Sequence, residues 1–535
     1  MSAASSFVRR ASLPLTFVAL LASGAGCSSA GDALEIDQGY GPGHGLPGEN
    51  EGESEQEDDA EPGGAGDDGG GDEGGGMDDA PPAPDDQGVD NASDPQACDA
   101  QADVTLYLSP DDSNSMSSPV QAREAALGDW ASVQSIAIRT WEFFNYYHFG
   151  YPEAQPGTVA VHPSLLPSPL GTKGEYLLQL GISSERLTPQ TRPPVNVTLV
   201  LDTSGSMAGR PMDMLRESCR AIASSLREGD TVSMVTWNTE NAVVLGGLHV
   251  DGPDDPTLLS TIEALEHGGG TDLNGGLQAG YALAEQVYDA DAINRVVLVS
   301  DGGANAGVTD IDLIAEHAGH HDEDGIYLVG VGVGDALGYH DHLMDAVTDT
   351  GKGASVFIAS ADEAWSTFGD GFISTMGVAA RDVQVQLDLP PGFEVVSTSA
   401  EELSTDASEV EPQHLAPNDA MVFHQRIRTC APELFDPSAT VTVTVRYLDA
   451  LTFDAREVVS EATFEQLLAA DPTPLLKGAA VFAYAESLKA YKHADHDGRG
   501  ATTNGAFEAL EAAEAALPAD PELAEIRGVL ETLAQ

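Results

Sequence analysis

The sequence is poor in basic residues. It contains 23 Lys and Arg against 87 Asp and Glu, which gives a formal net charge of −64 at pH 7. Proteins that bind nucleic acid neutralise phosphates with Lys and Arg, so a chain this acidic is expected to have no nucleic acid among its partners. A high-salt habitat or a cation-rich surface would each account for the acidity.

Cysteine is scarce as well, with four in 535 residues. No two of them have the short spacing of a zinc-binding pair. Cys219 falls in a predicted amphipathic helix, where a cysteine is usually a core residue. In an oxidising compartment, this leaves Cys98 and Cys430 as possible disulfide partners.

The sequence also lacks an apolar run long enough for a transmembrane helix, which needs about 20 residues. Residues 1–26 have two arginines followed by a short apolar core, a pattern typical of an export signal. The small residues before Cys27 resemble a bacterial lipoprotein signal, which implies that Cys27 is acylated and anchors the mature protein. By the same resemblance, Ser28 favours the outer membrane. An ordinary cleaved signal with a leftover cysteine is the alternative.

The segment after Cys27 is of low complexity. Residues 32–95 are mostly Gly, Asp, Glu and Pro, and they contain no Lys or Arg. Such a segment cannot bury enough apolar surface to offset the entropy lost on ordering. We therefore predict a disordered acidic tether over residues 27–97. Low-affinity calcium binding is the alternative interpretation, although no D-x-D-x-D-G loop is present.

A cluster of oxygen donors follows the apolar run Val195–Leu201. This run is typical of a strand buried on both faces, and Asp202, Ser204 and Ser206 come directly after it. In an open α/β sheet, ligands bind at the carboxyl ends of the strands. Carboxylate and hydroxyl oxygens are the hard ligands that Mg²⁺, Mn²⁺ and Ca²⁺ prefer.

Two later segments each place another oxygen donor at a strand or loop end. The glycine-rich loop Gly268–Asp272 carries Thr271 and opens a predicted helix. A second apolar strand, Arg295–Ser300, ends at Asp301. We expect Thr271 and Asp301 to lie at the same sheet edge as Asp202.

With these motifs, the chain resembles the von Willebrand factor A (VWA) family. The resemblance implies a metal-ion-dependent adhesion site, and the sequence has a matching residue at every ligand position: Asp202, Ser204, Ser206, Thr271 and Asp301. It implies Mg²⁺ as the expected ion, with Mn²⁺ or Ca²⁺ as alternatives. It also implies a protein partner whose carboxylate completes the metal's ligands. A degenerate site is the alternative, but none of the five residues is missing.

The flanks resemble a group of bacterial VWA lipoproteins. The segment RTWEFFNYYHFGYP precedes the DTSGS motif, and a strand-rich tail follows it. The aromatic residues of Gln134–Tyr151 are expected to begin as a helix and to plug a core, with a ligand platform as the alternative. The resemblance extends roughly from Val104 to Tyr491.

The predicted fold class is α/β, with a doubly wound, mostly parallel, Rossmann-like sheet inserted into an antiparallel β-sandwich. Apolar strands alternate with helical periodicity in the centre, and alternating strands such as Val104–Ser109 and Asp382–Leu389 lie on both flanks. Both connections should leave the α/β domain opposite the metal loops. The predicted segments are a signal peptide at 1–26, a tether at 27–97, an N-terminal flank at 98–190, a VWA domain at 191–377, a sandwich segment at 378–465 and C-terminal helices at 466–535.

The expected function is metal-dependent binding of a protein partner at the cell envelope, in adhesion or assembly. The hydroxyl ligands are neutral, so the protein adds at most two negative charges and the ion stays electrophilic. The alternative is a structural subunit whose metal stabilises the fold. A metal-dependent hydrolase is less expected, because the loops offer no His or Glu as a general base, and only Asp272 adjoins Thr271. We therefore expect no enzyme, and a membrane contact through the lipid anchor only.

Overall fold

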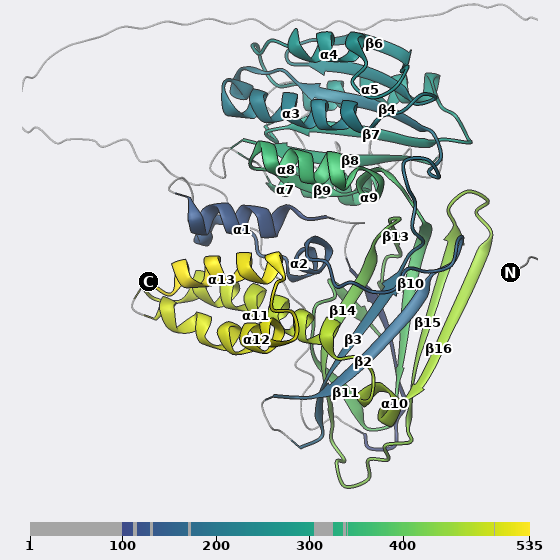
Figure 1. Cartoon of the computed structure of the whole chain (residues 1–535), viewed down its shortest axis with the longest axis vertical. Coiled ribbons are helices and arrows are strands. Elements are labelled where there is room, and N and C mark those ends of the chain that lie inside the picture. Colours follow the sequence, from purple (N-terminus) through teal and green to yellow (C-terminus); the bar gives the residue numbers. More distant parts are fainter. Residues whose placement is uncertain are drawn as a thin grey trace, which may run out of the picture. The chain divides into compact units, whose positions relative to one another are not determined.

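A computed structural model describes residues 99–110, 115–128, 132–169, 173–303, 325–334, 339, 341–496 and 498–535. The predicted signal peptide, the tether, Cys27 and Cys98 lie outside the described residues. Within the described ranges, the strands form three sheets (Figure 1). No helix in these ranges is both long enough and apolar enough to cross a bilayer.

One sheet has six strands in the order β6-β5-β4-β7-β8-β9, and every neighbouring pair is parallel except β5 and β6. The strands are β4 (Val195–Asp202), β5 (Thr231–Trp237), β6 (Asn241–His249), β7 (Ile293–Ser300), β8 (Ile326–Val333) and β9 (Ser355–Ile358). All residues of β4, β8 and β9 are buried, because helices cover both faces of the sheet. This confirms the predicted doubly wound α/β domain.

The helices divide between the two faces of this sheet (Figure 1). They are α3 (Arg210–Ser225), α4 (Pro256–Glu263), α5 (Leu273–Gln286), α7 (Asp341–Thr350), α8 (Ala361–Trp365) and α9 (Phe372–Met376). Apolar side chains of α3, α4, α8 and α9 share one core cluster, and those of α5 and α7 share another. The predicted closing helix, Ala361–Ser374, is interrupted by a π-helical turn at Ser366–Asp370.

The other two sheets pack as a sandwich with one common core. One has the order β12-β1-β10-β15-β16, with β13 also paired to β10, and the other has the order β11-β14-β3-β2. The strands are β1 (Val104–Ser109), β2 (Ala160–Pro167), β3 (Glu175–Ser183), β10 (Ala380–Leu389), β11 (Phe393–Thr398), β12 (Glu402–Ser404), β13 (Gln413–Leu415), β14 (Ala420–Thr429), β15 (Thr440–Asp449) and β16 (Ala455–Thr463).

The sandwich is built from both flanks of the α/β domain. Val104 of β1 pairs with Leu389 of β10, and Ser183 of β3 pairs with Ala420 of β14. In both pairs, one strand precedes the α/β domain in the chain and the other follows it. The predicted insertion of the α/β domain into a β-sandwich is confirmed.

The C-terminal helices are α10 (Phe464–Leu468), α11 (Thr473–His493), α12 (Asn504–Ala516) and α13 (Pro521–Leu533). The aromatic segment packs against them, and Phe143 contacts Tyr484 edge to face with ring centroids 5.4 Å apart. The expected core plug is therefore present. The segment was expected to begin as a helix, and it begins instead with a short 3₁₀ turn (Val133–Ser135), which α2 (Thr140–Tyr146) follows.

The helix α1 (Ser117–Leu127), which the sequence did not reveal, ties the α/β domain to the C-terminal helices. Just before it, the Met116 amide donates to the Ser355 carbonyl at 2.7 Å and so caps the β9 edge of the sheet. On α1 itself, Arg123 pairs with Glu363 of α8 at 2.7 Å and with Glu525 of α13 at 3.1 Å. One guanidinium, 13% exposed, thus joins three parts of the fold.

Both connections to the sandwich lie at the amino-terminal ends of the parallel strands. The Ile293 amide donates to the Pro194 carbonyl at 2.8 Å, where the chain enters β4. The Arg295 Nε donates to the Met376 carbonyl at 2.7 Å, where the chain leaves α9. Asp202 and Asp301 lie at the opposite, carboxyl-terminal ends of β4 and β7. This confirms the expectation that both connections leave the α/β domain opposite the metal loops.

Arg192→Ala should lower the free energy of unfolding by about 3–5 kcal/mol, because it leaves the buried Asp230 carboxylate without its cation. Arg192 donates to both Asp230 oxygens, at 2.9 and 2.6 Å, and both side chains are at most 1% exposed. Chemical denaturation followed by circular dichroism measures the loss. The matched control is Arg186→Ala, which removes an exposed pair with Glu153 and should leave the midpoint unchanged.

Candidate metal site

Asp202 forms the floor of the site, at the carboxyl end of the central strand β4. Its Oδ1 accepts a hydrogen bond from the Ser204 amide at 2.8 Å, and its Oδ2 accepts one from the Ser300 hydroxyl at 2.7 Å. The side chain is fully buried. Both carboxylate oxygens are therefore held in fixed positions before any ligand binds.

Ser204 and Ser206 lie on the loop that runs from the buried Asp202 to the protein surface. Their hydroxyl oxygens are 3.0 Å apart, on the loop that turns into a 3₁₀ helix at Gly205–Met207. Ser204 is buried, whereas Ser206 is exposed. An ion held between them would keep a side open to a partner.

The glycine-rich loop packs directly against the Asp202 loop. The Gly205 amide donates to the Gly269 carbonyl at 3.2 Å, and the Gly268 amide donates to the Thr203 carbonyl at 2.8 Å. Gly269 has φ +88°, and a Cβ there would lie 3.0 Å from Thr239 Oγ1, so this position requires glycine. These contacts bring Thr271, which is 2% exposed, to the site.

Asp301 comes from β7, the strand next to β4. It is 7% exposed, and its Oδ1 accepts from the Gly303 amide at 3.2 Å. Asp202 is the last residue of β4, and Asp301 directly follows β7. Because neighbouring parallel strands end at the same edge, the two carboxylates lie at adjacent strand ends. The structure thus brings the five predicted residues to one edge of the sheet.

Within the part of the chain that the structure describes, the acidic charge at this site has no cationic partner. Burial raises the pKa of Asp202 to about 6, while hydrogen bonds from Ser204 and Ser300 lower it and the nearby Asp301 carboxylate raises it. Among the described residues, no Lys, Arg or His forms an ion pair with either carboxylate. Two buried, acidic groups with neighbouring hydroxyls fit a hard divalent cation, which would offset their desolvation cost.

The residues present therefore fit the implied metal. Asp202, Ser204, Ser206, Thr271 and Asp301 would hold it, and the bound ion would supply an electrophilic centre for an oxygen ligand. Over the described ranges, no group of three His, Cys, Asp or Glu side chains is arranged to hold a metal, so a site built from nitrogen and sulfur ligands is not found there.

Ser300 is a site residue that the sequence reasoning missed. Its hydroxyl orients Asp202 and also accepts from the Gly302 amide at 2.9 Å. In the sequence, its role was indicated only by its place: Ser300 is the one hydroxyl residue of the apolar run RVVLVS and stands directly before Asp301.

Ser300→Ala should weaken Mg²⁺ binding by about 10–100-fold, because the Asp202 carboxylate loses the group that orients it. Isothermal calorimetry of the purified protein with Mg²⁺ measures this change. Ser300→Thr, which keeps the hydroxyl, should recover most of the affinity. An alanine variant with wild-type affinity would contradict the orienting role.

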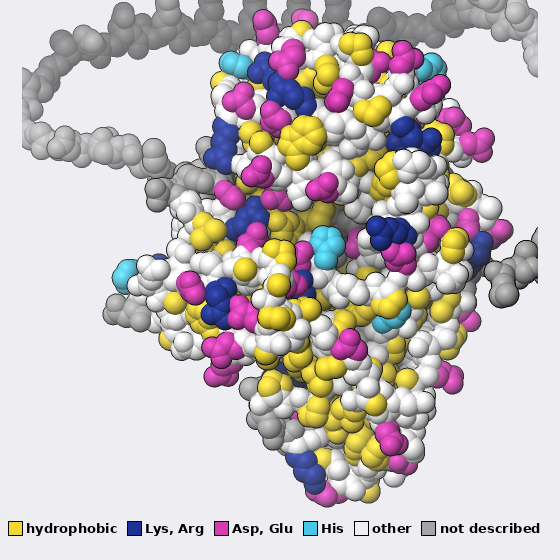
Figure 2. All heavy atoms as spheres, in the orientation of Figure 1, with side chains coloured by type: hydrophobic (Ala, Val, Ile, Leu, Met, Phe, Trp, Pro, Cys, Tyr) yellow, Lys and Arg dark blue, Asp and Glu magenta, His cyan; other side chains and the backbone are white. Residues whose placement is uncertain are grey.

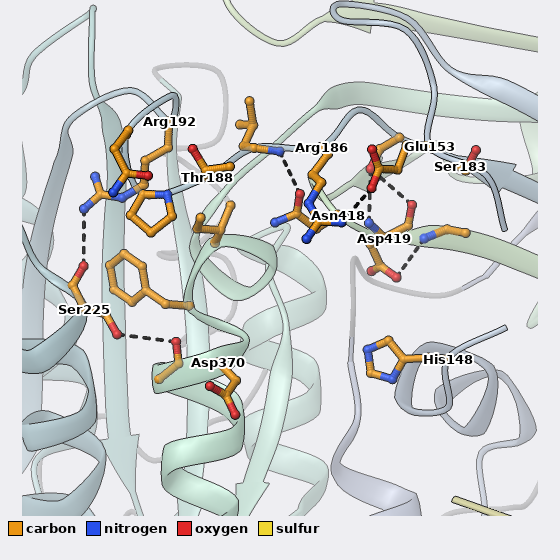
Figure 3. A pocket seen from close by; sticks show the side chains of 18 of the residues that line it. His148, Glu153, Ser183, Arg186, Thr188, Arg192, Ser225, Asp370, Asn418 and Asp419 are labelled. Atoms are coloured by element: carbon orange, nitrogen blue, oxygen red, sulfur yellow. Dashed lines mark hydrogen bonds and ion pairs between the residues drawn. The ribbon is translucent and has the colours of Figure 1, made fainter. Parts of the chain in front are cut away.

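A separate pocket of about 1110 Å³ lies near the opposite end of the α/β domain (Figure 3). Its walls come from the end of α3, the chain leading to Arg192 and the turn before β14. It mixes charges: Arg186 pairs with Glu153, and burial raises the pKa of Asp419 to about 6. None of the five predicted ligands lines it.

Comparisons with known proteins identify a domain in the centre of the chain. Residues 197–304 match the family model of the von Willebrand factor type A domain. The uncharacterized protein YfbK of Escherichia coli is 26% identical over 266 residues, which cover 48% of this chain and 46% of that protein. The inter-alpha-trypsin inhibitor heavy chain H2 of Sus scrofa is 28% identical over 177 residues, covering 31% of this chain and 19% of that one.

The chain spans less than half the length of these curated relatives. A solved structure of a von Willebrand factor type A protein from Catenulispora acidiphila has 16% identity and a TM-score of 0.45, covering 67% of this chain and 87% of that one. The matched residues contain Asp202, Thr271 and Asp301, the ends of the three segments that meet at the site. This chain therefore contains a VWA domain, to which residues 197–304 belong.

Proposed function

We propose that the VWA domain of this chain binds a protein partner through a divalent cation held by Asp202, Ser204, Ser206, Thr271 and Asp301. VWA domains mediate protein–protein interaction and adhesion. The observation that carries the proposal is a pair of buried carboxylates without a cationic partner in the described part of the chain, beneath the exposed Ser206.

The partner supplies a carboxylate in this proposal. Two acidic residues can neutralise at most a divalent charge, and the three hydroxyls add none. An Asp or Glu of the partner is a hard, anionic oxygen ligand that fits the exposed side of such an ion. Mg²⁺ is the favoured ion, with Mn²⁺ and Ca²⁺ as alternatives.

Binding is favoured over hydrolysis by the role of Asp272. This residue is the acid nearest to Thr271 in sequence, and it caps α5 by accepting from the Gly275 amide at 3.0 Å. A general base must instead face the water that it deprotonates. The other alternative is a structural subunit of an envelope complex in which the metal only stabilises the fold.

A crosslinking pull-down from envelope extracts tests the proposal, with Mg²⁺ in one arm and EDTA in the other. A partner should be captured with Mg²⁺ and lost with EDTA, and the protein should still melt cooperatively in EDTA. Capture that is equal in both arms would reject metal-dependent binding. Loss of the cooperative transition in EDTA would instead support the structural alternative.

We also propose that the chain is attached to the outer membrane through an acylated Cys27, with residues 27–97 as the tether. The support is the sequence pattern before Cys27 and the acidic composition after it. Cys27→Ser should move the protein from the membrane fraction to the soluble fraction. Mass spectrometry of the mature amino terminus should find a lipid on Cys27, and an unmodified cysteine there would reject the anchor.

A further inference from the structure

The two edges of the VWA sheet differ. Flanking residues of the same chain cap the β9 edge through the Met116 amide. The other edge strand, β6, lies at the end of the VWA domain away from the sandwich (Figure 1). Among the described residues, no strand pairs with its outer side.

Over its first residues, Asn241–Val243, this open edge has neither charge nor proline to protect it. Natural edge strands avoid pairing with other chains through charged residues, prolines, shortness or bulges. The sequence of β6, NAVVLGGLH, has no charged residue and no proline, and Val243 and Val244 are 60% and 41% exposed. By contrast, β2 contains two prolines, β16 three charged residues, and β12 only three residues. On the face shown in Figure 2, acidic side chains are spread over much of the surface. The sequence of β6 contains no Asp or Glu.

The open edge begins beside the metal site. The turn from β5 to β6 holds the glycine-rich loop, because the Gly270 amide donates to Thr239 Oγ1 at 2.7 Å. In the same turn, the Asn238 carbonyl accepts from the Asp272 amide at 2.8 Å. Thr271 lies between these two contacts, so the start of β6 adjoins the loop that carries a predicted metal ligand.

The backbone of Val243 points to the open side. The Trp237 carbonyl accepts from the Thr203 amide, so Trp237 is turned toward β4, and Thr236 is turned toward β6. In an antiparallel ladder, hydrogen-bonded and non-hydrogen-bonded pairs alternate. Ala242, opposite Thr236, therefore bonds to β5, and the N–H and C=O of Val243 are directed outward.

A bulge limits the regular part of this edge. The pairing shifts between Val243 and Leu245, so that Val244 is an extra residue opposite β5. A second shift in register lies between Leu245 and Leu248, so the pairing beyond Val244 is irregular. The regular open edge is therefore the short stretch Asn241–Val243, which is the part beside the metal loops.

We infer that the outer edge of β6 at Val243 pairs with an extended strand of the same partner that supplies the carboxylate to the metal. The inference rests on the proposed function and specifies the partner: an extended, uncharged segment rich in apolar residues, adjoining an Asp or Glu. Main-chain hydrogen bonds to the edge supply affinity, and the metal fixes the register. Val243 and Val244 favour apolar side chains on the added strand.

A random-peptide display selection against the full chain in Mg²⁺ tests this inference. Recovered peptides that bind in Mg²⁺ and not in EDTA are resynthesised, and their affinity is measured for the wild type, Val243→Pro and Val243→Thr. The proline removes the outward N–H without breaking a bond to β5, whereas the threonine keeps it. Val243→Pro should weaken peptide binding about tenfold or more, with Mg²⁺ affinity unchanged, and Val243→Thr should stay within about twofold.

Peptide variants provide a second measurement that does not depend on how well the proline variant folds. In one set of peptides, a single backbone N–H beside the acid is methylated, at a different residue in each peptide. Methylation should reduce affinity at every second position, because alternate residues direct their N–H toward β6. Metal-dependent peptides that tolerate both changes would overturn the inference and leave the proposed function intact. Failure to recover any metal-dependent peptide would count against both. Mg²⁺-independent dimerisation that Val243→Pro abolishes would identify a second copy of the chain as the occupant and also overturn the inference.

Discussion

Asp202→Ala should abolish divalent-cation binding while the protein stays folded. Asp202 contributes a charged oxygen ligand at the end of β4, and its hydrogen bonds are made within the site by Ser204 and Ser300. Its loss removes one of the two anionic groups, so the remaining hydroxyls cannot compensate. Isothermal calorimetry with Mg²⁺ or Mn²⁺ should show only background heat, and binding of the partner should be lost in parallel.

The matched control is Asp213→Ala on α3, because the Asp213 side chain is 68% exposed and is not among the ligands. It should titrate like the wild type. Titration heat that persists unchanged in Asp202→Ala would reject the assigned site. A circular dichroism spectrum that matches the wild type establishes that the loss is local.

Without metal, the wild type and Asp202→Ala should also differ in how their stability depends on pH. The raised pKa of Asp202 means that the folded state binds the proton more tightly than the unfolded state. This stabilisation is complete below the unfolded pKa, near 4, and is lost as pH rises through about 6. In EDTA, the free energy of unfolding of the wild type should therefore fall between pH 4 and 7, by on the order of 3 kcal/mol from this group. The Asp202→Ala variant should not show this contribution to the fall.

Loss of the Cys430 disulfide is the second large effect expected, at about 5 kcal/mol of unfolding free energy. Cys430 is disulfide-bonded, and its predicted partner, Cys98, lies outside the described residues. The Cys430 amide donates to the Gly392 carbonyl at 3.0 Å, and the Gly392 amide donates to the Ala102 carbonyl at 3.3 Å. The chain soon after Cys98 thus lies close to Cys430, and a bridge between them would restrict the unfolded chain over a long loop.

Denaturant unfolding of Cys430→Ser against the oxidised wild type measures this effect. Peptide mapping without reductant should recover a linked Cys98–Cys430 peptide. A free thiol at Cys98 would reject the pairing. Adding reductant to a Cys98→Ser/Cys430→Ser variant should not lower its free energy of unfolding further, because Cys219 is already a free, buried thiol.

The sequence predicted the elements whose side chains follow a simple period. The apolar run of β4 and the alternation of β10 are visible because each reflects burial on two faces or on one. Helix α1 was missed because its buried residues include Ser117, Ser118 and Gln121, which pack against polar groups and leave no apolar stripe. Strand β2 was missed because its two prolines are typical of loops, and they are tolerated here on an edge strand.

The candidate metal site also has parts that the sequence pattern predicted and parts that it did not. Its five predicted ligands lie at strand and loop ends, where spacing in the sequence specifies position on the sheet edge. The supporting contacts do not have such spacing. Thr239 holds Gly270 from another turn, and this contact depends on how β5 and β6 pair, so no local pattern predicts it.

The insertion of the VWA domain into the sandwich has a consequence for how the chain folds. Strands β1 and β3 are synthesised well before their partners β10 and β14, so the sandwich depends on pairings of high contact order, which form slowly. Once the VWA domain has folded, its two ends lie at neighbouring positions near Ile293 and Arg295, and the flanks meet across a short gap. We expect the inserted domain to fold first and to act as the template for its host, and unpaired β1 and β3 to be where aggregation begins if it does not.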